Sequence, residues 1–176
     1  VVIGCILGDG AMRCKKNALL EINHSAKQKS YVDWKYDSLR RFVATPPKIR
    51  RGGYNRVAYR FTTRSLPELT VLYKQFYKDY IKIIPRGLKI KPLSLAIWFM
   101  DDGCKSHRAI YLNTQKFDLK SQMQLIRFLE KQFKIKASLN KDKIYYRLRI
   151  AVASVQKFKS IVRPYILPQF NYKLPS

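Results

Sequence analysis

Apolar side chains recur along this chain with two periods, and these periods predict short helices and hairpins in alternation. Residues 11–25 predict a β-hairpin, because Leu20 and Ile22 alternate with polar neighbours in its second arm. Residues 27–43 place their apolar side chains near one helical stripe. Residues 48–63 predict a second hairpin, which turns at a pair of adjacent glycines.

A third helix is predicted to follow the second hairpin. Ser65 and Glu68 have the spacing of a capping box, in which the two side chains bond the first amides of a helix. The apolar positions that this helix would turn toward the core are Leu69, Leu72, Tyr73, Phe76 and Tyr80. Residues 81–92 contain prolines and a glycine and therefore predict a connector.

The same order then repeats. Residues 105–115 predict a hairpin arm, Asp118 is placed to cap a helix that runs to Phe133, and residues 137–151 predict another hairpin before a last helix at 153–162. Helical spacing in the long helix predicts a buried stripe of Leu119, Met123, Ile126 and Leu129. Alternation in the last hairpin arm predicts inward-facing side chains at Ile144, Tyr146, Leu148 and Ile150.

Two related blocks head these two series of elements. Residues 2–10 read VIGCILGDG and residues 94–103 read SLAIWFMDDG, so each is an apolar helix that closes on Asp-Gly. We expect the closing glycines, Gly10 and Gly103, to end the helices with a positive φ. The duplication predicts an α+β protein of two pseudo-symmetric αββαββα halves, each with a four-stranded antiparallel sheet. The predicted boundaries are residues 1–85 and 93–176, with a connector at 86–92.

The carboxylates that close the blocks are the candidate chemistry. Asp9 and Asp102 would stand at helix C-termini, where the macrodipole is already negative, so they favour a nearby cation. If the two helices pack together, both carboxylates meet and can bind a hard cation such as Mg²⁺, with Mn²⁺ or Ca²⁺ able to occupy the same sites. By registry Asp102 is the repeated group. Asp101, like Gly8 in the first block, is expected to lend only its backbone carbonyl.

Composition points to a polyanionic partner. The formal net charge is +25, from 36 Lys and Arg against 11 Asp and Glu, which is far more than solubility requires. A β-ribbon fits the major groove of DNA, where Arg and Lys read guanine and Asn reads adenine. The candidate contacts on the polar faces of the hairpins are Arg13, Lys15, Glu21, Asn23, Lys48, Arg50, Arg51, Arg56, Arg60, Lys136, Ser138, Asn140, Arg147 and Arg149.

The remaining features of the sequence concern its cysteines, apolar runs, histidines and two lysines. The three cysteines are odd in number and lack metal-type spacing, which favours buried thiols in a reducing, intracellular compartment. No apolar run approaches the roughly 18 residues of a membrane span. His24 and His107 are isolated and are expected to be surface residues without a role. Lys82 and Lys173 each precede a proline at nearly the same distance after Asp9 and Asp102, so each could stabilise charge beside a phosphate.

The two blocks, and the tail segment NYKLP, resemble the LAGLIDADG homing endonucleases in their single-chain, two-motif form. The resemblance implies a monomeric, site-specific double-strand DNA endonuclease that uses divalent metal at a long asymmetric target. It implies a DNA-binding saddle of two sheets with the motif helices at the interface, and a lysine, Lys82 or Lys173, near each active site. Asn113-Thr114-Gln115-Lys116 resembles the family segment whose glutamine holds water near the metal, which would be Gln115. Ser25 replaces that residue in the first half, and an ordinary strand-to-helix turn is the alternative.

Two other functions stay open. An intron RNA maturase could use the same fold on its own intron, and a non-catalytic DNA-binding regulator could keep the saddle alone. Such a regulator would be expected to lose motif carboxylates, and this chain keeps both. An intron-encoded or free-standing form is expected, because no splicing block is visible. Its source would be an organelle or a bacterium, with no targeting segment recognisable.

Overall fold

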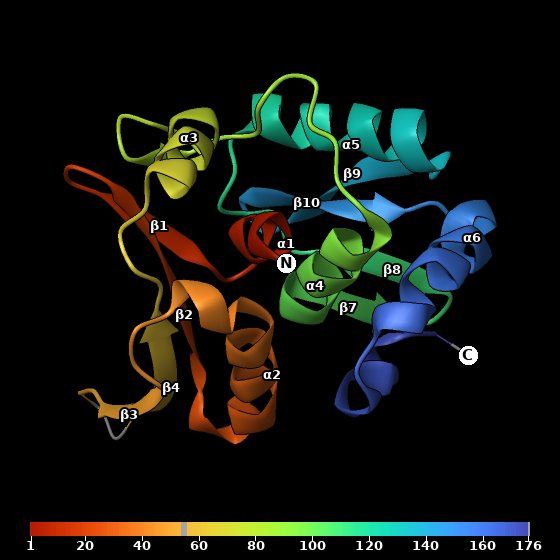
Figure 1. Ribbon diagram of the computed structural model, residues 1–176. Helices are drawn as coiled ribbons and strands as arrows, with labels where there is room; N and C mark the ends of the chain where they lie inside the picture. The colour runs from red at the N-terminus through yellow and green to blue at the C-terminus, as the bar shows by residue number, and fades with distance from the viewer. Residues whose placement is uncertain (54–55, 176) are drawn as a thin grey trace. The chain divides into compact units, whose positions relative to one another are not determined.

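A computed structural model of the chain describes residues 1–53 and 56–175, which form two compact units, Val1–Lys74 and Gln75–Ser176. Each unit contains helices and a four-stranded antiparallel sheet (Figure 1). The predicted α+β class is therefore confirmed. The order helix–strand–strand–helix–strand–strand–helix also occurs twice along the chain, as predicted. The predicted boundaries of the halves remain a prediction.

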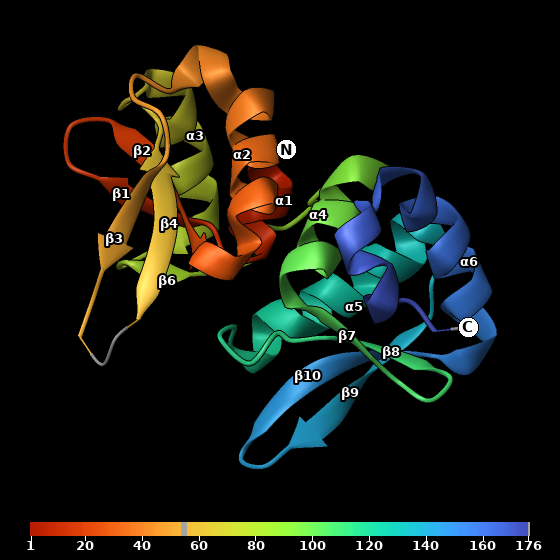
Figure 2. The same ribbon diagram turned by 90° about the horizontal axis from the view of Figure 1, so that it is seen from below.

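The first series of elements builds the sheet β1-β2-β4-β3. Its helices lie against one face of this sheet and leave the other face bare (Figure 2). The elements are α1 (Val2–Leu7), β1 (Ala11–Cys14), β2 (Ala18–Ser25), α2 (Lys29–Leu39), β3 (Lys48–Arg51), β4 (Val57–Thr62) and α3 (Pro67–Phe76), and short 3-10 turns at Ala26–Gln28 and Arg40–Phe42 flank α2.

The second series builds the sheet β7-β8-β10-β9, again with helices on one face (Figure 2). A two-residue hairpin, β5 (Tyr77–Lys78) and β6 (Ile81–Lys82), precedes it. The other elements are α4 (Pro92–Asp102), β7 (Gly103–Ser106), β8 (Ala109–Leu112), α5 (Leu119–Phe133), β9 (Ala137–Asp142), β10 (Tyr145–Ile150) and α6 (Val152–Val162), followed by 3-10 segments at Arg163–Tyr165 and Pro168–Lys173.

Each core lies between the helices and the covered face of its sheet. In the first unit the alternation of β2 places Leu20 and Ile22 in the core, as predicted, and β4 adds Phe61. In the second unit α4 is buried on all sides from Ser94 to Met100, because it packs among α6, the 3-10 segment Arg163–Tyr165 and β7. Full burial of one helix explains why its sequence is apolar without a polar stripe.

The glycines that close the two motif blocks do not have the predicted conformation. Gly103 has a φ of −81°, and Gly10 is absent from the positive-φ residues of the described chain. Glycine is needed there because of space. A Cβ on Gly103 would lie 2.1 Å from Cδ2 of Phe99, and one on Gly10 would lie 2.7 Å from the carbonyl oxygen of Cys5. The chain thus turns from helix into strand against its own helix backbone.

The segment after α3 also differs from its prediction. The helix begins at Pro67, one residue later than a cap at Ser65 requires, and ends at Phe76. Tyr80 therefore lies beyond the helix, in the tight turn between β5 and β6, with a φ of 62° and 86% of its surface exposed. The prediction that Tyr80 faces the core is wrong, because the helical spacing was extended past the point where the chain reverses.

Two stripes predicted in the second unit are shifted. In α5 the buried side chains include Gln122, Leu125 and Leu129, whereas Leu119 and Met123 are exposed. Gln122 is drawn inward because it accepts a hydrogen bond from the Thr114 hydroxyl and donates one to the Phe117 carbonyl.

In the last hairpin, Leu148 and Ile150 face the core as predicted, but Ile144 and Tyr146 are exposed. Ile144 lies in the turn, at the far end of the hairpin, where the strands extend past the covering helices. The capping prediction at Asp118 is confirmed, since its carboxylate accepts a hydrogen bond of 2.7 Å from the amide of Ser121.

The structure also bears on the predictions about membrane spans and about the cysteines. In the described part of the chain, no helix combines the length and the apolar character that crossing a membrane requires. None of the three cysteines forms a disulfide. Cys5 is buried as predicted, whereas Cys14 and Cys104 are only half-buried.

Candidate active site and nucleic-acid interface

The C-terminal end of α4 gathers charged groups of both signs. Asp102 is the last residue of this helix, and its side chain is 14% exposed. Lys116 donates a hydrogen bond of 2.8 Å from Nζ to Oδ2 of Asp102. The amide of Asn113 donates to the Asp102 carbonyl at 2.9 Å. The segment at 113–116 thus holds the motif residue through both its backbone and its side chain.

Lys173 lies at the same helix end. Its side chain is buried, and Nζ donates to the carbonyl of Met100 at 2.6 Å and to that of Asp101 at 3.2 Å. These carbonyls belong to the last turn of α4, whose hydrogen-bonding capacity and negative dipole end favour a cation. One of the two lysines selected from sequence is therefore in contact with the motif helix. Its role in catalysis remains a prediction.

Gln115 makes a different contact from the one its resemblance suggests. Its Nε2 donates to Oδ2 of Asp142 on β9 at 2.8 Å. Lys116, the next residue, makes the contact with Asp102 that the sequence analysis did not anticipate. The signal was present, since Lys116 belongs to the same four-residue segment, but residue type alone does not tell which of two neighbours turns toward the helix end.

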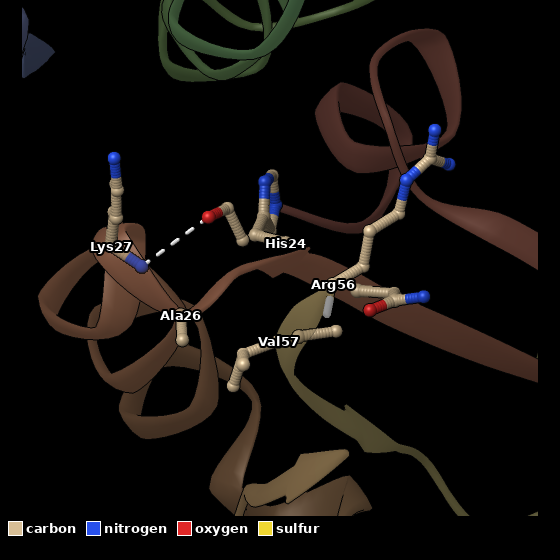
Figure 3. Close-up of a pocket in the computed structure, with 8 residues that line it drawn as sticks. His24, Ala26, Lys27, Arg56 and Val57 are labelled. Carbon is tan, nitrogen blue, oxygen red and sulfur yellow. Dashed lines mark hydrogen bonds between the residues drawn. The ribbon is translucent and has the colours of Figure 1, made fainter. Parts of the chain in front are cut away.

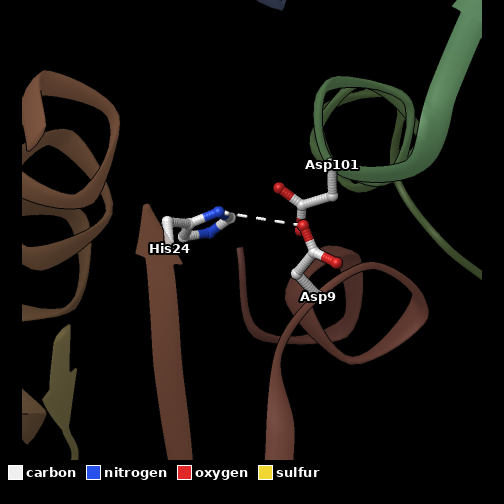
Figure 4. A group of neighbouring side chains, drawn as sticks. All are labelled: Asp9, His24 and Asp101. Carbon is white, nitrogen blue, oxygen red and sulfur yellow. Dashed lines mark ion pairs between the residues drawn. The ribbon is translucent and has the colours of Figure 1, made fainter. Parts of the chain in front are cut away.

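In the first unit the motif carboxylate has another partner. Asp9 follows α1, its side chain is 44% exposed, and Oδ2 lies 3.7 Å from Nδ1 of His24 (Figure 4). His24 is buried in β2, so the prediction of a surface histidine is wrong. The inward alternation of Leu20 and Ile22 continues to position 24, and this pattern would have placed the ring correctly.

Behind His24 lies a lysine that the structure buries completely. Lys35 of α2 has no exposed surface, and its Nζ is 3.0 Å from Nε2 of His24. The same Nζ lies 4.2 Å from the centre of the Tyr31 ring, which is one helical turn earlier. Lys82, the lysine selected from sequence for this half, is half-buried in β6 opposite Tyr77, and its role remains a prediction.

Donor chemistry at the two helix ends suits a hard divalent cation. The carboxylates of Asp9 and Asp102 and the carbonyls of Gly8 and Asp101 offer oxygen atoms, which Mg²⁺ and Ca²⁺ prefer. At the end of α4 two ammonium groups, those of Lys116 and Lys173, already approach such oxygens. These contacts are what the negative end of a helix dipole favours.

The bare face of the first sheet carries a row of charged side chains. The strand register places Lys48, Arg60 and Asn23 side by side. Glu21 lies on the same face. Its Oε2 atom is 3.0 Å from Nη2 of Arg13 and 4.0 Å from Nη1 of Arg60. The exposed Arg13 and the half-buried Arg60 thus keep defined positions on this face, where they can meet an anionic surface.

Not every predicted contact residue belongs to that row. Arg51 pairs with Val57, so the register places it on the opposite face of the sheet from Arg50. Lys15 lies in the turn after β1. Arg56 precedes β4, and with Asn23, Lys27 and other residues it lines a hollow of about 570 Å³ beside the end of β2 (Figure 3).

The bare face of the second sheet combines arginine with aromatic side chains. The register places Ser138 beside Arg149 and Asn140 beside Arg147, so these four predicted residues share one face. The guanidinium of Arg147 lies 4.3 Å from the centre of the Tyr111 ring. Tyr111 and the exposed Tyr145 were missed, because alternation marked them only as outward-facing. Lys136 is exposed just before β9.

Most of the chain matches one known family, and several named proteins are similar to it. The family model described as the LAGLIDADG DNA endonuclease family matches residues 1–158. The chain is 31% identical over 138 residues to the cytochrome b mRNA maturase bI2 of Saccharomyces cerevisiae, covering 72% of this chain and 33% of that protein. It is 35% identical over 124 residues to the intron-encoded endonuclease ai4 of Dictyostelium discoideum, covering 66% and 76%.

A solved structure matches almost the whole chain. This is the homing endonuclease I-WcaI bound to its DNA recognition sequence, with 28% identity, a TM-score of 0.89, and coverage of 98% of this chain and 83% of that one. The chain spans only 33% of the Saccharomyces maturase and 50% of its Debaryomyces hansenii counterpart. It therefore corresponds to part of the length of these two relatives.

Proposed function

The chain belongs to the LAGLIDADG DNA endonuclease family, and from this premise we propose that it is a site-specific double-strand DNA endonuclease. The proposed reaction is metal-dependent hydrolysis of one phosphodiester bond in each strand of a long, asymmetric target. One chain carries both motif blocks, so the active form is a monomer. In this proposal residues 1–85 and 93–176 are the two halves and residues 86–92 connect them.

One observation carries the proposal most directly. In each half an apolar helix ends in a motif carboxylate, and the chain then passes directly into the first strand of a sheet with a basic bare face. Asp9 precedes β1, and Asp102 precedes β7. In each half the motif carboxylate therefore lies just before the first strand of the candidate DNA-binding sheet.

Asp9 and Asp102, with the carbonyls of Gly8 and Asp101, would hold Mg²⁺. When bound, the metal supplies Lewis-acid activation of a water and neutralises charge on the phosphate. Lys173 and Lys116 already stand at the end of α4, where an ammonium can stabilise negative charge that develops on a phosphate oxygen. Lys82 is proposed for the same role in the other half-site, and Gln115 for orienting water.

The bare faces would bind the target. Phosphate contacts from Arg and Lys supply affinity, and side chains that reach base edges supply sequence preference. The fixed positions of Arg13 and Arg60 around Glu21 favour base reading at these two residues. The I-WcaI structure, solved with its DNA recognition sequence, supports double-stranded DNA as the partner.

A second candidate function is supported by a specific finding. Two relatives are named cytochrome b mRNA maturases, so the chain could bind its own intron RNA and assist splicing. Names that refer to cytochrome b and to introns also favour an organellar source over a bacterial one. The two functions use different substrates and can be tested side by side.

The test compares cleavage and splicing with one protein preparation. Cleaved sites are selected from a randomised DNA library with Mg²⁺, and the intron RNA is assayed for splicing in parallel. Recovery of a defined site cut on both strands supports the endonuclease, and the same reaction with EDTA should give none. A protein that promotes splicing but cuts no member of the library would instead establish the maturase function.

A further inference from the structure

The two halves hold their motif carboxylates by different chemistry. In the second half the ammonium of Lys116 contacts Asp102 directly, at 2.8 Å. In the first half a histidine ring faces Asp9, and a buried lysine stands behind the ring. The arrangement in the first half is energetically unfavourable, because a lysine without exposed surface loses its hydration. This cost calls for a reason.

Joining the strand to the helix does not by itself require a charged residue. The segment Asn23-His24-Ser25 corresponds to Asn113-Thr114-Gln115, so Thr114 stands where His24 stands in the first half. Thr114 is also fully buried, and its hydroxyl donates to Gln122 of α5 at 3.0 Å. A neutral hydroxyl–amide pair thus joins strand to helix in the second half. The first half could use such a pair for packing alone.

The contact between Lys35 and His24 favours one tautomer of the His24 ring. An ammonium has donors only, so Lys35 Nζ at 3.0 Å requires an acceptor lone pair on Nε2. The centre of the Tyr31 ring lies 4.2 Å from the same Nζ, which is the geometry of a cation–π pair. The proton of the neutral imidazole then lies on Nδ1, the nitrogen that faces Asp9 Oδ2 in Figure 4.

We propose that Lys35 fixes the tautomer of His24 so that its Nδ1–H is directed at Asp9, which makes His24 the positioning residue of the first motif carboxylate. The 3.7 Å separation is longer than a hydrogen bond, so the interaction is an electrostatic attraction between the N–H dipole and the carboxylate. Residues that orient metal-binding side chains in this way commonly contribute 10- to 100-fold to affinity or activity, as an order of magnitude. The inference deepens the proposed function and rests on it for the role of Asp9.

The first test does not require any cleavage. The chain has only two histidines, and His107 is an exposed turn residue, so His107→Gln leaves His24 as the single histidine signal. In ¹⁵N-labelled protein we expect the proton on Nδ1 and a bare Nε2. Lys35→Met should move the proton, at least in part, to Nε2. A proton on Nε2 in the otherwise unchanged protein would overturn the inference.

The second test uses two variants that match in charge and differ in the reach of one side-chain amide. Lys35→Met removes the buried charge, and it is combined with either His24→Asn or His24→Gln. The asparagine amide nitrogen can stand near the position of histidine Nδ1, whereas the glutamine amide nitrogen stands near Nε2. We expect the asparagine variant to cut the Asp9-dependent strand at nearly the normal rate, and the glutamine variant to cut it about 10-fold more slowly.

The strand that depends on Asp102 serves as the internal reference. A fold defect would slow both strands, or both variants alike, and either result would contradict the positioning role. If the unmodified protein cut no DNA at all, the proposed function would fail, while the tautomer measurement would still decide the Lys35–His24 part. The two failures are therefore distinguishable.

Discussion

Replacing Gly103 with alanine tests the tight junction between α4 and β7. The added Cβ would lie 2.1 Å from Cδ2 of Phe99 and 2.4 Å from the Phe99 carbonyl oxygen. Neither atom can move cheaply, because one is backbone and the ring is fully buried and packs edge-on against Phe158. Overpacking of this kind costs roughly 1–3 kcal/mol, and we expect about 3 kcal/mol here.

The assay is equilibrium unfolding in urea. With a denaturant slope of about 2–3 kcal/mol per molar, the loss lowers the midpoint by about 1 M. Gly53→Ala is the matched control, because a Cβ there meets nothing within 4 Å, and its free energy of unfolding should change by less than about 1 kcal/mol. Equal midpoints for Gly103→Ala and Gly53→Ala would refute the close-approach explanation of this glycine.

Three further perturbations test the charges of the fold and of the site. Affinity for the selected target should fall with a slope of roughly −5 to −9 in log K against log salt, for about six to ten neutralised phosphates, and a flat response in a filter-binding assay would contradict binding by the basic faces. Asp118→Ala should cost about 1 kcal/mol of stability, because it removes a helix cap. The hydrogen bond to Ser121 lowers the pKa of Asp118 below its ordinary value of 3.8. The stability difference between the unmodified protein and Asp118→Ala should therefore be full above about pH 5 and vanish as the pH falls through the lowered folded pKa. A stability difference that persisted in acid unfolding curves would count against the cap. Lys173→Met should lower the free energy of unfolding by about 2–3 kcal/mol, because it leaves two carbonyls of α4 without their charged donor. In nicking assays it should slow cleavage of one strand about 100-fold, whereas Lys82→Ala should slow cleavage of the other strand. Normal stability and equal strand rates would contradict the assignment of these lysines.

Local patterns predicted the elements well, because hydrophobic periodicity and the capping and turn residues are properties of short segments. The order of helices and strands, the cap at Asp118 and the inward side of β2 all follow from neighbours within a few residues. The duplication of the two blocks gave the two-part organisation. These features did not depend on knowing which other segment packs against each element.

The errors arose where tertiary contacts decide. The burial of Gln122 rotates the core stripe of α5, and the partner that draws it inward, Thr114, lies before the helix. The reason for glycine at position 103 is a ring four residues earlier, and a preference for positive φ could not reveal it. Whether Gln115 or Lys116 meets Asp102 likewise depends on where β9 places Asp142.

One error had a readable cause. His24 was judged as an isolated histidine, although it continues the inward alternation of its strand, and Lys35 occupies the middle of the Tyr31–Leu39 stripe of α2. Two polar residues at core positions of adjoining elements indicate a buried pair. Reading each residue against the period of its element would have found the contact that now links the first motif to the core.

We propose that Asp9 and Asp102 each supply the carboxylate for the cut of one strand. The most direct measurement is cleavage of a supercoiled plasmid with one target site by Asp9→Asn and Asp102→Asn, with target binding measured in parallel. We predict unchanged binding within a few fold and no linear product from either variant, because each substitution removes a metal-binding charge but little of the basic surface. Linear product at the normal rate from either variant would contradict the account.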